Sequence, residues 1–210
     1  MTGAFITLEG GDGSGKTTQI GMLQSWLESE GRTVVRTREP GGTELGVEIR
    51  RLVQHTEGHV APRAEALLYA ADRAHHVATL VRPALERGEV VLQDRYLDSS
   101  VAYQGAGREL DGGQIRDLSL WAADGLLPDL TILLDLDPVA GRQRMAARED
   151  APYDRLEEAG EAFADRVRAK YVELAAAEPD RFVVIDASGS ADDVHARVVS
   201  HVRAMLDANR

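Results

Sequence analysis

Short apolar segments alternate along the chain with longer segments in which apolar residues recur at helical spacing. The short segments hold four to six residues and are rich in Val, Ile and Leu. This pattern is typical of parallel strands that are buried on both faces of a sheet. The predicted strands span residues 4–9, 33–37, 90–93, 130–135 and 182–186.

The longer segments predict helices between these strands. Gly31 follows the first of them and can end a helix in the left-handed conformation. Pro83 lies near the end of the second, where it predicts a kink or a break. The predicted helices span residues 16–30, 61–87, 111–125, 138–149, 156–178 and 191–206.

The alternation of strands and helices predicts an α/β fold with a five-stranded, mostly parallel sheet and helices on both faces. Neither a linker nor an internal repeat divides residues 1–210, so we expect a single domain. Right-handed crossovers bring the C-terminal ends of all strands to one edge, where ligands bind in such folds. Most of the residues discussed below directly follow a strand and should lie at that edge.

Composition excludes several classes of protein. The 210 residues carry a net charge of −11, and an acidic surface repels phosphate polymers, so we expect no nucleic-acid partner. The chain has no cysteine, which excludes disulfides and thiolate chemistry. No apolar run is long enough to span a membrane, and there is no room for a signal peptide before the glycine-rich loop at Gly10. We therefore expect a cytoplasmic protein without a membrane partner.

Residues 10–17 read GGDGSGKT and match the phosphate-binding pattern G-x-x-x-x-G-K-[ST] in full. A chain of this length matches the pattern by chance roughly once in a hundred, and here a strand precedes it and a helix follows. Lys16 can reach the β- and γ-phosphates, and the Thr17 hydroxyl can bind Mg²⁺. The alternative is a glycine-rich turn without a ligand. The expected ligands of the nucleotide phosphates are Gly10, Gly11, Asp12, Gly13, Ser14, Gly15, Lys16, Thr17 and Thr18.

An acidic and a basic residue, Asp94 and Arg95, directly follow the third predicted strand. A carboxylate in this place beside a phosphate loop can hold Mg²⁺ directly or through water. Arg95 is unusual for a switch GTPase, but in a kinase it can bridge a donor and an acceptor phosphate. A surface salt bridge between the two side chains is the alternative.

Three further segments offer groups that could bind a second anionic ligand. Arg38 follows the second predicted strand and precedes Glu39 and a turn that begins at Pro40, and its guanidinium can bind phosphate with two hydrogen bonds. Taken alone, the Arg38 segment is better explained by an ordinary turn with a solvated side chain, and the other two features are explained equally well by a packed ring or a helix cap. The other candidates are Tyr69 and Arg73 on one helical face, and the hydroxyl and amide groups of Ser99, Ser100, Tyr103 and Gln104.

A basic segment follows the fourth strand and helix. Residues 148–155 contain Pro152, several charges and few apolar side chains, so they predict an exposed loop. We interpret residues of about 141–157 as a lid that excludes water from the triphosphate, although a solvated charged loop is the alternative. The candidate lid cations are Arg142, Arg144, Arg148 and Arg155.

Together these motifs resemble the thymidylate kinases, a family of P-loop NTPase fold that phosphorylates nucleoside monophosphates. The resemblance runs from about residue 5 to residue 186. It is highly specific because several motifs agree in order and spacing. These motifs are the P-loop, REPGGT at 38–43, DRY at 94–96, DSS at 98–100, AYQG at 102–105 and the segment at 163–171.

The resemblance implies transfer of the γ-phosphate of ATP to dTMP, with Mg²⁺ as the metal and a homodimer as the assembly. It implies that Tyr69 stacks on thymine, where the family more often has Phe, and that Arg73 bonds a carbonyl of the base. Glu39 would lie near the acceptor and the metal, and Asp12 near the 3′-hydroxyl. Ser100 and Gln104 would line the base pocket, while Arg38 and Arg95 would hold the phosphate of dTMP.

The resemblance also implies a source for the catalytic cations. The P-loop contains no arginine, so the lid would supply one, with Arg155 the first choice and Arg148 the second. The acceptor phosphate is largely ionised at neutral pH because its second pKa is about 6, so no general base is required. Catalysis would depend on alignment and on charge neutralisation by Lys16, Mg²⁺, Arg95 and the lid arginine.

Three other interpretations are compatible with a P-loop. A P-loop kinase for another acceptor is the nearest of them, because its phosphate sites would look the same. A regulatory ATPase switch would hydrolyse ATP slowly without an acceptor, and the three arginines Arg38, Arg73 and Arg95 argue against it. The net charge disfavours an ATPase that binds nucleic acid.

Overall fold

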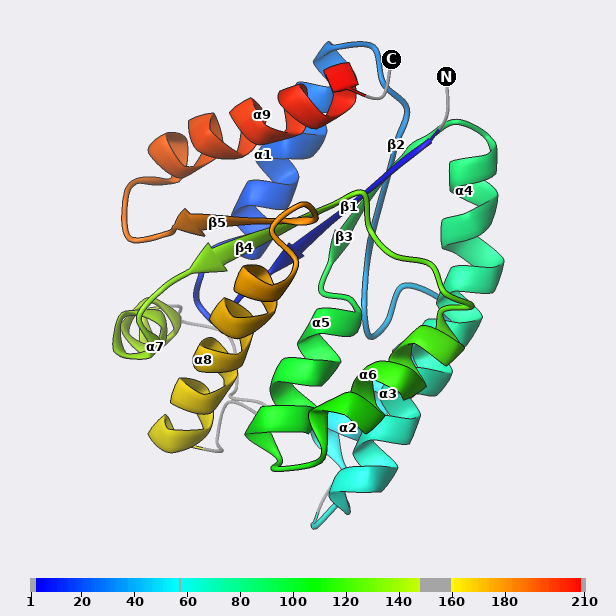
Figure 1. Ribbon diagram of the computed structural model, residues 1–210, viewed down its shortest axis with the longest axis vertical. Helices are drawn as coiled ribbons and strands as arrows, with labels where there is room; N and C mark the ends of the chain where they lie inside the picture. Colours follow the sequence, from blue (N-terminus) through cyan, green and yellow to red (C-terminus); the bar gives the residue numbers. More distant parts are fainter. Residues whose placement is uncertain (1–2, 57, 148–159, 209–210) are drawn as a thin grey trace.

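The computed structural model describes residues 3–56, 58–147 and 160–208. Five parallel strands form one sheet in the order β2-β3-β1-β4-β5 (Figure 1). The predicted parallel sheet is therefore confirmed. The strands are β1 (Ala4–Glu9), β2 (Val34–Arg38), β3 (Val90–Asp94), β4 (Leu130–Asp135) and β5 (Phe182–Asp186).

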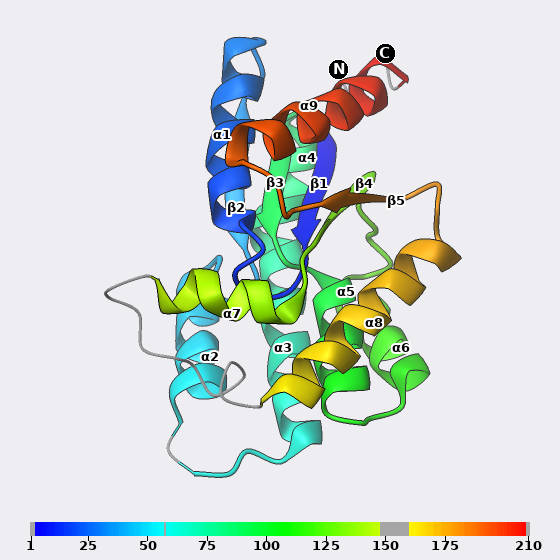
Figure 2. The ribbon, with the colours of Figure 1, turned by 90° about the vertical axis from the view of Figure 1, so that its left-hand side faces the viewer.

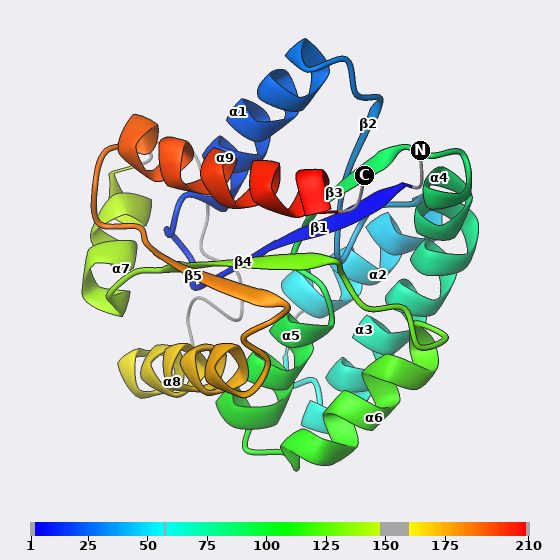
Figure 3. The same cartoon turned by 45° about the horizontal axis from the view of Figure 1, so that its top comes forward.

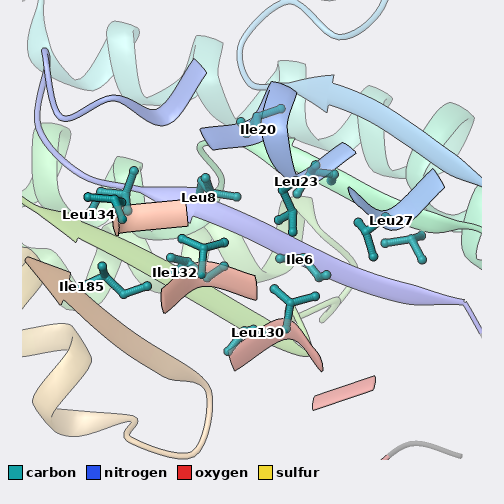
Figure 4. Packing of buried hydrophobic residues seen from close by; sticks show 14 of the residues in the cluster. Ile6, Leu8, Ile20, Leu23, Leu27, Leu130, Ile132, Leu134 and Ile185 are labelled. Atoms are coloured by element: carbon teal, nitrogen blue, oxygen red, sulfur yellow. The ribbon is translucent and has the colours of Figure 1, made fainter. Parts of the chain in front are cut away.

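Helices cover both faces of this sheet (Figure 3). Helices α1 (Lys16–Ser29) and α9 (Ala191–Ala208) pack on one face, where Ile6 and Leu8 of β1 meet Leu23 of α1 (Figure 4). Phe5 points to the other face and packs among residues of the helices that precede β3. Because successive residues of β1 are buried on opposite sides, the strand is apolar almost throughout, as the sequence predicted.

Most of the remaining helices lie toward the end of the molecule away from α9 (Figure 2). Two π-helical segments, η1 and η2, each continue an α-helix without a break in the chain. No helix in the described ranges is long and apolar enough to cross a bilayer. The elements are α2 (Glu44–His55), α3 (Pro62–His76), η1 (Val77–Val81), α4 (Arg82–Glu86), α5 (Leu97–Ser100), η2 (Val101–Gly107), α6 (Gly112–Ala122), α7 (Pro138–Ala146) and α8 (Glu161–Ala177).

The predicted strands agree with the structure to within one residue at each end. The predicted break near Pro83 exists, but it takes the form of the π-helical segment η1, which ends two residues before the proline. Helix α2 was not predicted. Thr43 caps it by accepting a hydrogen bond from the Gly46 amide at 3.0 Å, and Ile49 and Val53 face the core.

The topology places the ends of three strands side by side. Leu8 of β1 lies opposite Asp94 of β3, and Arg38 of β2 lies opposite the same Asp94. The glycine-rich loop follows β1 directly, so the phosphate-binding pattern, Asp94 and Arg38 meet at one edge of the sheet. This edge is where the sequence analysis placed the candidate chemistry.

The packing of α1 on the sheet gives the first prediction. Leu23 is completely buried between α1 and the sheet, so Leu23→Ala should lower the free energy of unfolding by about 2–5 kcal/mol. Val172→Ala on α8 is the control, because Val172 is 45% exposed and should cost less than about 0.5 kcal/mol. Urea unfolding at one protein concentration measures both. Equal costs for the two variants would contradict the packing described here.

Candidate active site

The glycine-rich loop connects β1 to α1 and has backbone angles that suit glycine. Gly13 has a φ of 78°, and a Cβ atom at this position would collide with the carbonyl oxygen of Gly141 in α7. Gly15 has a φ of 95° and precedes the first residue of α1, and a Cβ there would meet nothing within 4 Å. The loop therefore leaves open space at a helix N-terminus, where backbone amides favour an anion.

Lys16 begins α1 and folds back over the loop. Its ammonium donates hydrogen bonds to the carbonyl oxygens of Gly10 at 3.0 Å and Gly11 at 2.8 Å. Burial, together with the nearby positive charge of Arg95, lowers the pKa of Lys16 to about 8. A phosphate bound in the loop would add negative charge beside this ammonium and favour its protonated form.

Asp94 and Thr17 offer oxygen atoms for a divalent cation beside this loop. Thr17 is exposed on the first turn of α1, as is its neighbour Thr18. The Oδ1 atom of Asp94 is buried and has no hydrogen-bond partner among the described residues, and the negative charge of Asp94 acts on Lys16. A buried carboxylate oxygen without a donor fits a hard cation such as Mg²⁺, because oxygen atoms are its preferred ligands.

Arg95 connects the end of β3 to the glycine-rich loop. Its guanidinium donates to the carbonyl oxygen of Gly10 at 3.1 Å, to Asp12, and to the hydroxyl of Tyr103 at 3.0 Å. The hydroxyl of Tyr103 in turn donates to Asp12 at 3.0 Å, and the guanidinium lies 4.8 Å from the centre of the Tyr103 ring. Three residues that the sequence analysis assigned to different roles therefore form one cluster.

In this cluster, the attraction between opposite charges outweighs the cost of burying them. Burial opposes the ionisation of Asp12, but the cations Arg95 and Lys16 outweigh it and hold the pKa of Asp12 below its usual value. Burial likewise opposes the charge of Arg95, while Tyr103 and Asp12 raise its pKa. Asp12 and Arg95 are therefore both charged at neutral pH, and the arginine can bind a further anion only by sharing its donors with Asp12.

A second polar cluster lies around Arg73 of α3. The side chain of Arg73 is only 1% exposed, and it donates to Glu39 at 2.9 Å, to Ser100 at 3.1 Å and to Ser119 at 3.1 Å. His76 bonds the other oxygen of Glu39 at 2.9 Å. The loop after β2, the last turn of α3 and the end of α5 therefore meet at one buried guanidinium.

The remaining predicted residues lie around these two clusters. Arg38 is exposed at the edge of the sheet. The carbonyl of Pro40 accepts a hydrogen bond from the Arg50 side chain at 3.1 Å.

The predicted residues of the base pocket have their own partners. Tyr69 is partly buried against the apolar cluster of α8, and Gln104 donates a hydrogen bond to Glu65 at 2.9 Å. Ser99 is separate from Arg73 and bonds instead to Glu9.

Several residues of these networks were missed by the sequence analysis. They include Glu9, His76 and Tyr171, all of them buried. Glu9 could have been noticed, because a carboxylate that ends an otherwise apolar strand requires a partner. His76 and Tyr171 lie in helices where a packed side chain is the ordinary expectation, so nothing in the pattern separated them from the core.

The segment interpreted as a lid is only partly described. Arg142 and Arg144 belong to α7, where they donate to Glu161 at 2.7 Å and to the carbonyl of Ser188 at 3.3 Å. Arg148 and Arg155 lie outside the described residues. A hollow beside Asp12, between α7 and α8, is lined by Tyr103, Arg142, Phe163 and Val167 among others.

Comparison with known proteins agrees with this geometry. The family model for thymidylate kinase matches residues 8–198. The chain is 64% identical over 208 residues to the thymidylate kinase of Clavibacter michiganensis subsp. michiganensis, covering 99% of this chain and 98% of that protein. It is 67% identical over 196 residues to the thymidylate kinase of Leifsonia xyli subsp. xyli, covering 93% and 92%.

A solved structure shows the same fold. The crystal structure of thymidylate kinase from Ehrlichia chaffeensis superposes with a TM-score of 0.78 at 33% sequence identity, covering 96% of this chain and 99% of that one. Sequence, fold and the matched length agree, and the chain belongs to the thymidylate kinase family.

Proposed function

We propose that this protein is a thymidylate kinase that transfers the γ-phosphate of ATP to dTMP and forms dTDP and ADP. The observation that carries the proposal is the position of Arg95. Its guanidinium reaches from the end of β3 to the carbonyl oxygen of Gly10 in the phosphate loop. A cation in this place lies where a donor phosphate and an acceptor phosphate would meet.

The donor half of the site consists of the phosphate loop and its neighbours. Backbone amides of residues 10–15, the Lys16 ammonium and the hydroxyls of Thr17 and Thr18 would bind the phosphates of ATP. Thr17 and Asp94 would hold Mg²⁺, which supplies charge neutralisation at the phosphates when it is bound. The buried Asp94 oxygen without a partner among the described residues supports this assignment.

The acceptor half consists of the residues around Arg73. Arg73 and Ser100 already share a hydrogen bond, and both can turn polar atoms toward a carbonyl of thymine. Tyr69 would stack on the base and Gln104 would line its edge. Arg38 at the edge of the sheet would bind the phosphate of dTMP together with Arg95. Glu39 would lie near the acceptor and the metal, and Pro40 would shape the turn that follows Arg38.

Transfer then requires alignment rather than acid-base chemistry. An oxygen of the dTMP phosphate attacks the γ-phosphorus, and the bond from that phosphorus to the bridging oxygen of ADP breaks. The attacking oxygen is already ionised near neutral pH, because the second pKa of a phosphate monoester is about 6. Lys16 and Arg95 stabilise the charge that builds up on the transferred group. Arg155 or Arg148 would contribute a further cation from the lid.

The assembly is proposed to be a cytoplasmic homodimer of single-domain subunits. Exposed apolar side chains on neighbouring helices support an interface, namely Leu45 and Val47 of α2, Leu67 of α3 and Trp121 of α6. Trp121 is 80% exposed, which is unusual for a tryptophan on a monomer. These helices lie together at one side of the molecule (Figure 1).

An acceptor panel tests the function. ADP release is measured with ATP and Mg²⁺ and with dTMP, dUMP, dCMP, dAMP or dGMP as the acceptor. We expect fast turnover with dTMP, weaker turnover with dUMP and near-background rates with the others. ADP formation that is independent of any acceptor would contradict a kinase and favour an ATPase switch. Preference for another acceptor would retain the phosphoryl chemistry but overturn the base-pocket assignment.

Removal of the Asp94 charge tests the metal assignment. We expect Asp94→Asn to lower kcat by about 10²-fold and to raise the Mg²⁺ concentration required for half-maximal rate, because an amide binds a hard cation less well than a carboxylate does. Asp180→Asn is the control, since Asp180 is exposed at the opposite end of the sheet, before β5. An unchanged Mg²⁺ dependence in Asp94→Asn would show that the metal binds elsewhere.

The lowered pKa of Lys16 predicts proton uptake on nucleotide binding. At about pH 8 the free protein holds Lys16 only partly protonated, and bound phosphate favours the charged form. Calorimetric titration of MgATP in buffers of different ionisation enthalpy should therefore show uptake at pH 8 and less at pH 6.5. Lys16→Arg should abolish the difference, whereas Lys170→Arg on the surface of α8 should keep it. Equal uptake at both pH values would argue against a lowered pKa.

A further inference from the structure

Glu9 is a completely buried carboxylate at the end of β1, one residue before the phosphate loop. It accepts three hydrogen bonds from outside its own strand. The donors are the backbone amide of Tyr96 at 2.7 Å, the hydroxyl of Ser99 at 2.6 Å and the hydroxyl of Tyr171 at 2.9 Å. Because its oxygens face protein donors and not open space, Glu9 is placed to hold other residues.

Both hydroxyls that contact Glu9 also contact Arg95. Ser99 and Tyr171 accept hydrogen bonds from one nitrogen of the guanidinium, at 3.3 Å and 3.4 Å. Each hydroxyl has one proton, and an ionised carboxylate is the strongest acceptor within reach. The two hydroxyls also lie 2.7 Å apart, where either could donate to the other. When their protons point to Glu9 instead, the lone pairs of both oxygens are left facing Arg95. Glu9 thereby determines how the two hydroxyls present themselves to the guanidinium.

The backbone of Arg95 is held by the same strand end. Arg95 has a φ of 64°, a conformation that is unfavourable for a side chain other than glycine and that persists only when its surroundings enforce it. Its amide donates to the carbonyl of Leu8 at 3.0 Å, and the next amide, of Tyr96, donates to Glu9. The two amides that flank the strained residue are therefore both fixed by β1.

We propose that Glu9 is a positioning residue that fixes both the backbone and the guanidinium of Arg95 against the phosphate loop. The proposal rests on the proposed phosphoryl transfer, in which Arg95 meets the phosphates. It assigns Glu9 no contact with either substrate. The carboxylate acts through Tyr96, Ser99 and Tyr171, and its effect on the reaction should pass entirely through Arg95.

The buried charge of Glu9 lowers the stability of the fold, a cost that an uncharged side chain of the same shape would avoid. Burial and the negative charge of Asp98 in α5 together raise the pKa of Glu9 to about 7, although Ser99, Arg95 and Tyr171 oppose the shift. Lys16 also faces this carboxylate. Since the pKa in the unfolded chain is near 4.5, the contribution of Glu9 to stability falls as pH rises from about 4.5 to 7. An amide at this position would avoid that loss.

Glu9→Gln tests the proposal because it keeps the shape of the side chain and removes the charge. We expect kcat with dTMP to fall by about 10²-fold, since a misplaced catalytic group costs about that much, while KM for ATP changes by less than about threefold. Wild-type kcat should rise as pH increases from about 6.5 to 8, and the variant should be flat over that range. A folded Glu9→Gln protein with kcat within threefold of wild type would overturn the proposal.

A matched control separates positioning from loss of a buried hydrogen bond. Thr7 lies two residues before Glu9 on the same strand, is completely buried, and bonds Thr131 at 3.0 Å. Thr7→Val should lower stability without changing the pH dependence of kcat. In an Arg95→Ala background, Glu9→Gln should cost almost nothing further in kcat. Costs that add in the double variant would show that Glu9 acts independently of Arg95 and would contradict the proposal.

A measurement without turnover keeps the test independent of the proposed function. In protein labelled with ¹⁵N-arginine, the guanidinium N–H signals of Arg95 should be resolved and slowly exchanging in wild type and Thr7→Val, and averaged in Glu9→Gln. Identical signals in all three proteins would refute the positioning role. If wild type shows no dTMP-dependent turnover while these signals still respond to Glu9→Gln, the proposed function fails and the positioning role stands.

Discussion

The position of Arg95 is the constraint on which the rest of the site depends. The side chain of Arg95 is only 18% exposed. Its guanidinium must therefore find acceptors, because an unpaired buried charge is strongly unfavourable. Its acceptors include Gly10 and Asp12 of the phosphate loop, the hydroxyl of Tyr103 in η2 and the hydroxyl of Tyr171 in α8. The phosphate loop and α8, both remote from Arg95 in sequence, therefore converge on one cation. The site is assembled by the need to compensate this charge as much as by the packing of the sheet.

The buried cluster around Arg73 follows the same logic at the acceptor side. Glu39, Ser100 and Ser119 supply one acceptor to each nitrogen of the guanidinium, and His76 bonds the remaining oxygen of Glu39. Removing one partner of such a network leaves another group unsatisfied, so the network tolerates little change. Rigid placement of polar atoms favours discrimination between bases, because a base that offers the wrong pattern leaves buried groups without partners.

The sequence predicted those parts of the fold that local patterns determine. The strands and the phosphate loop were predicted because apolar runs and glycine spacing are local properties. Helix α2 was missed, although Thr43 caps it and Ile49 and Val53 give it a buried face. Individual site residues could be proposed from motifs, but the contact between Arg95 and Asp12 could not. That contact joins segments 83 residues apart, and only the order of strands in the sheet brings them together.

The two π-helical segments explain part of what local patterns could not predict. A wider turn changes which side chains of a helix share a face, and such turns are frequent at functional sites. Segment η1 begins directly after His76, and η2 contains Tyr103 and Gln104. A regular helix through residues 97–107 would present its side chains at a constant 3.6-residue spacing. In the π-helical segment Tyr103 instead turns its hydroxyl to Asp12 while Gln104 reaches Glu65. Segment η2 thus departs from regular geometry where polar side chains face the site, whereas η1 follows the buried His76 and packs Val77 and Val81 in the apolar core.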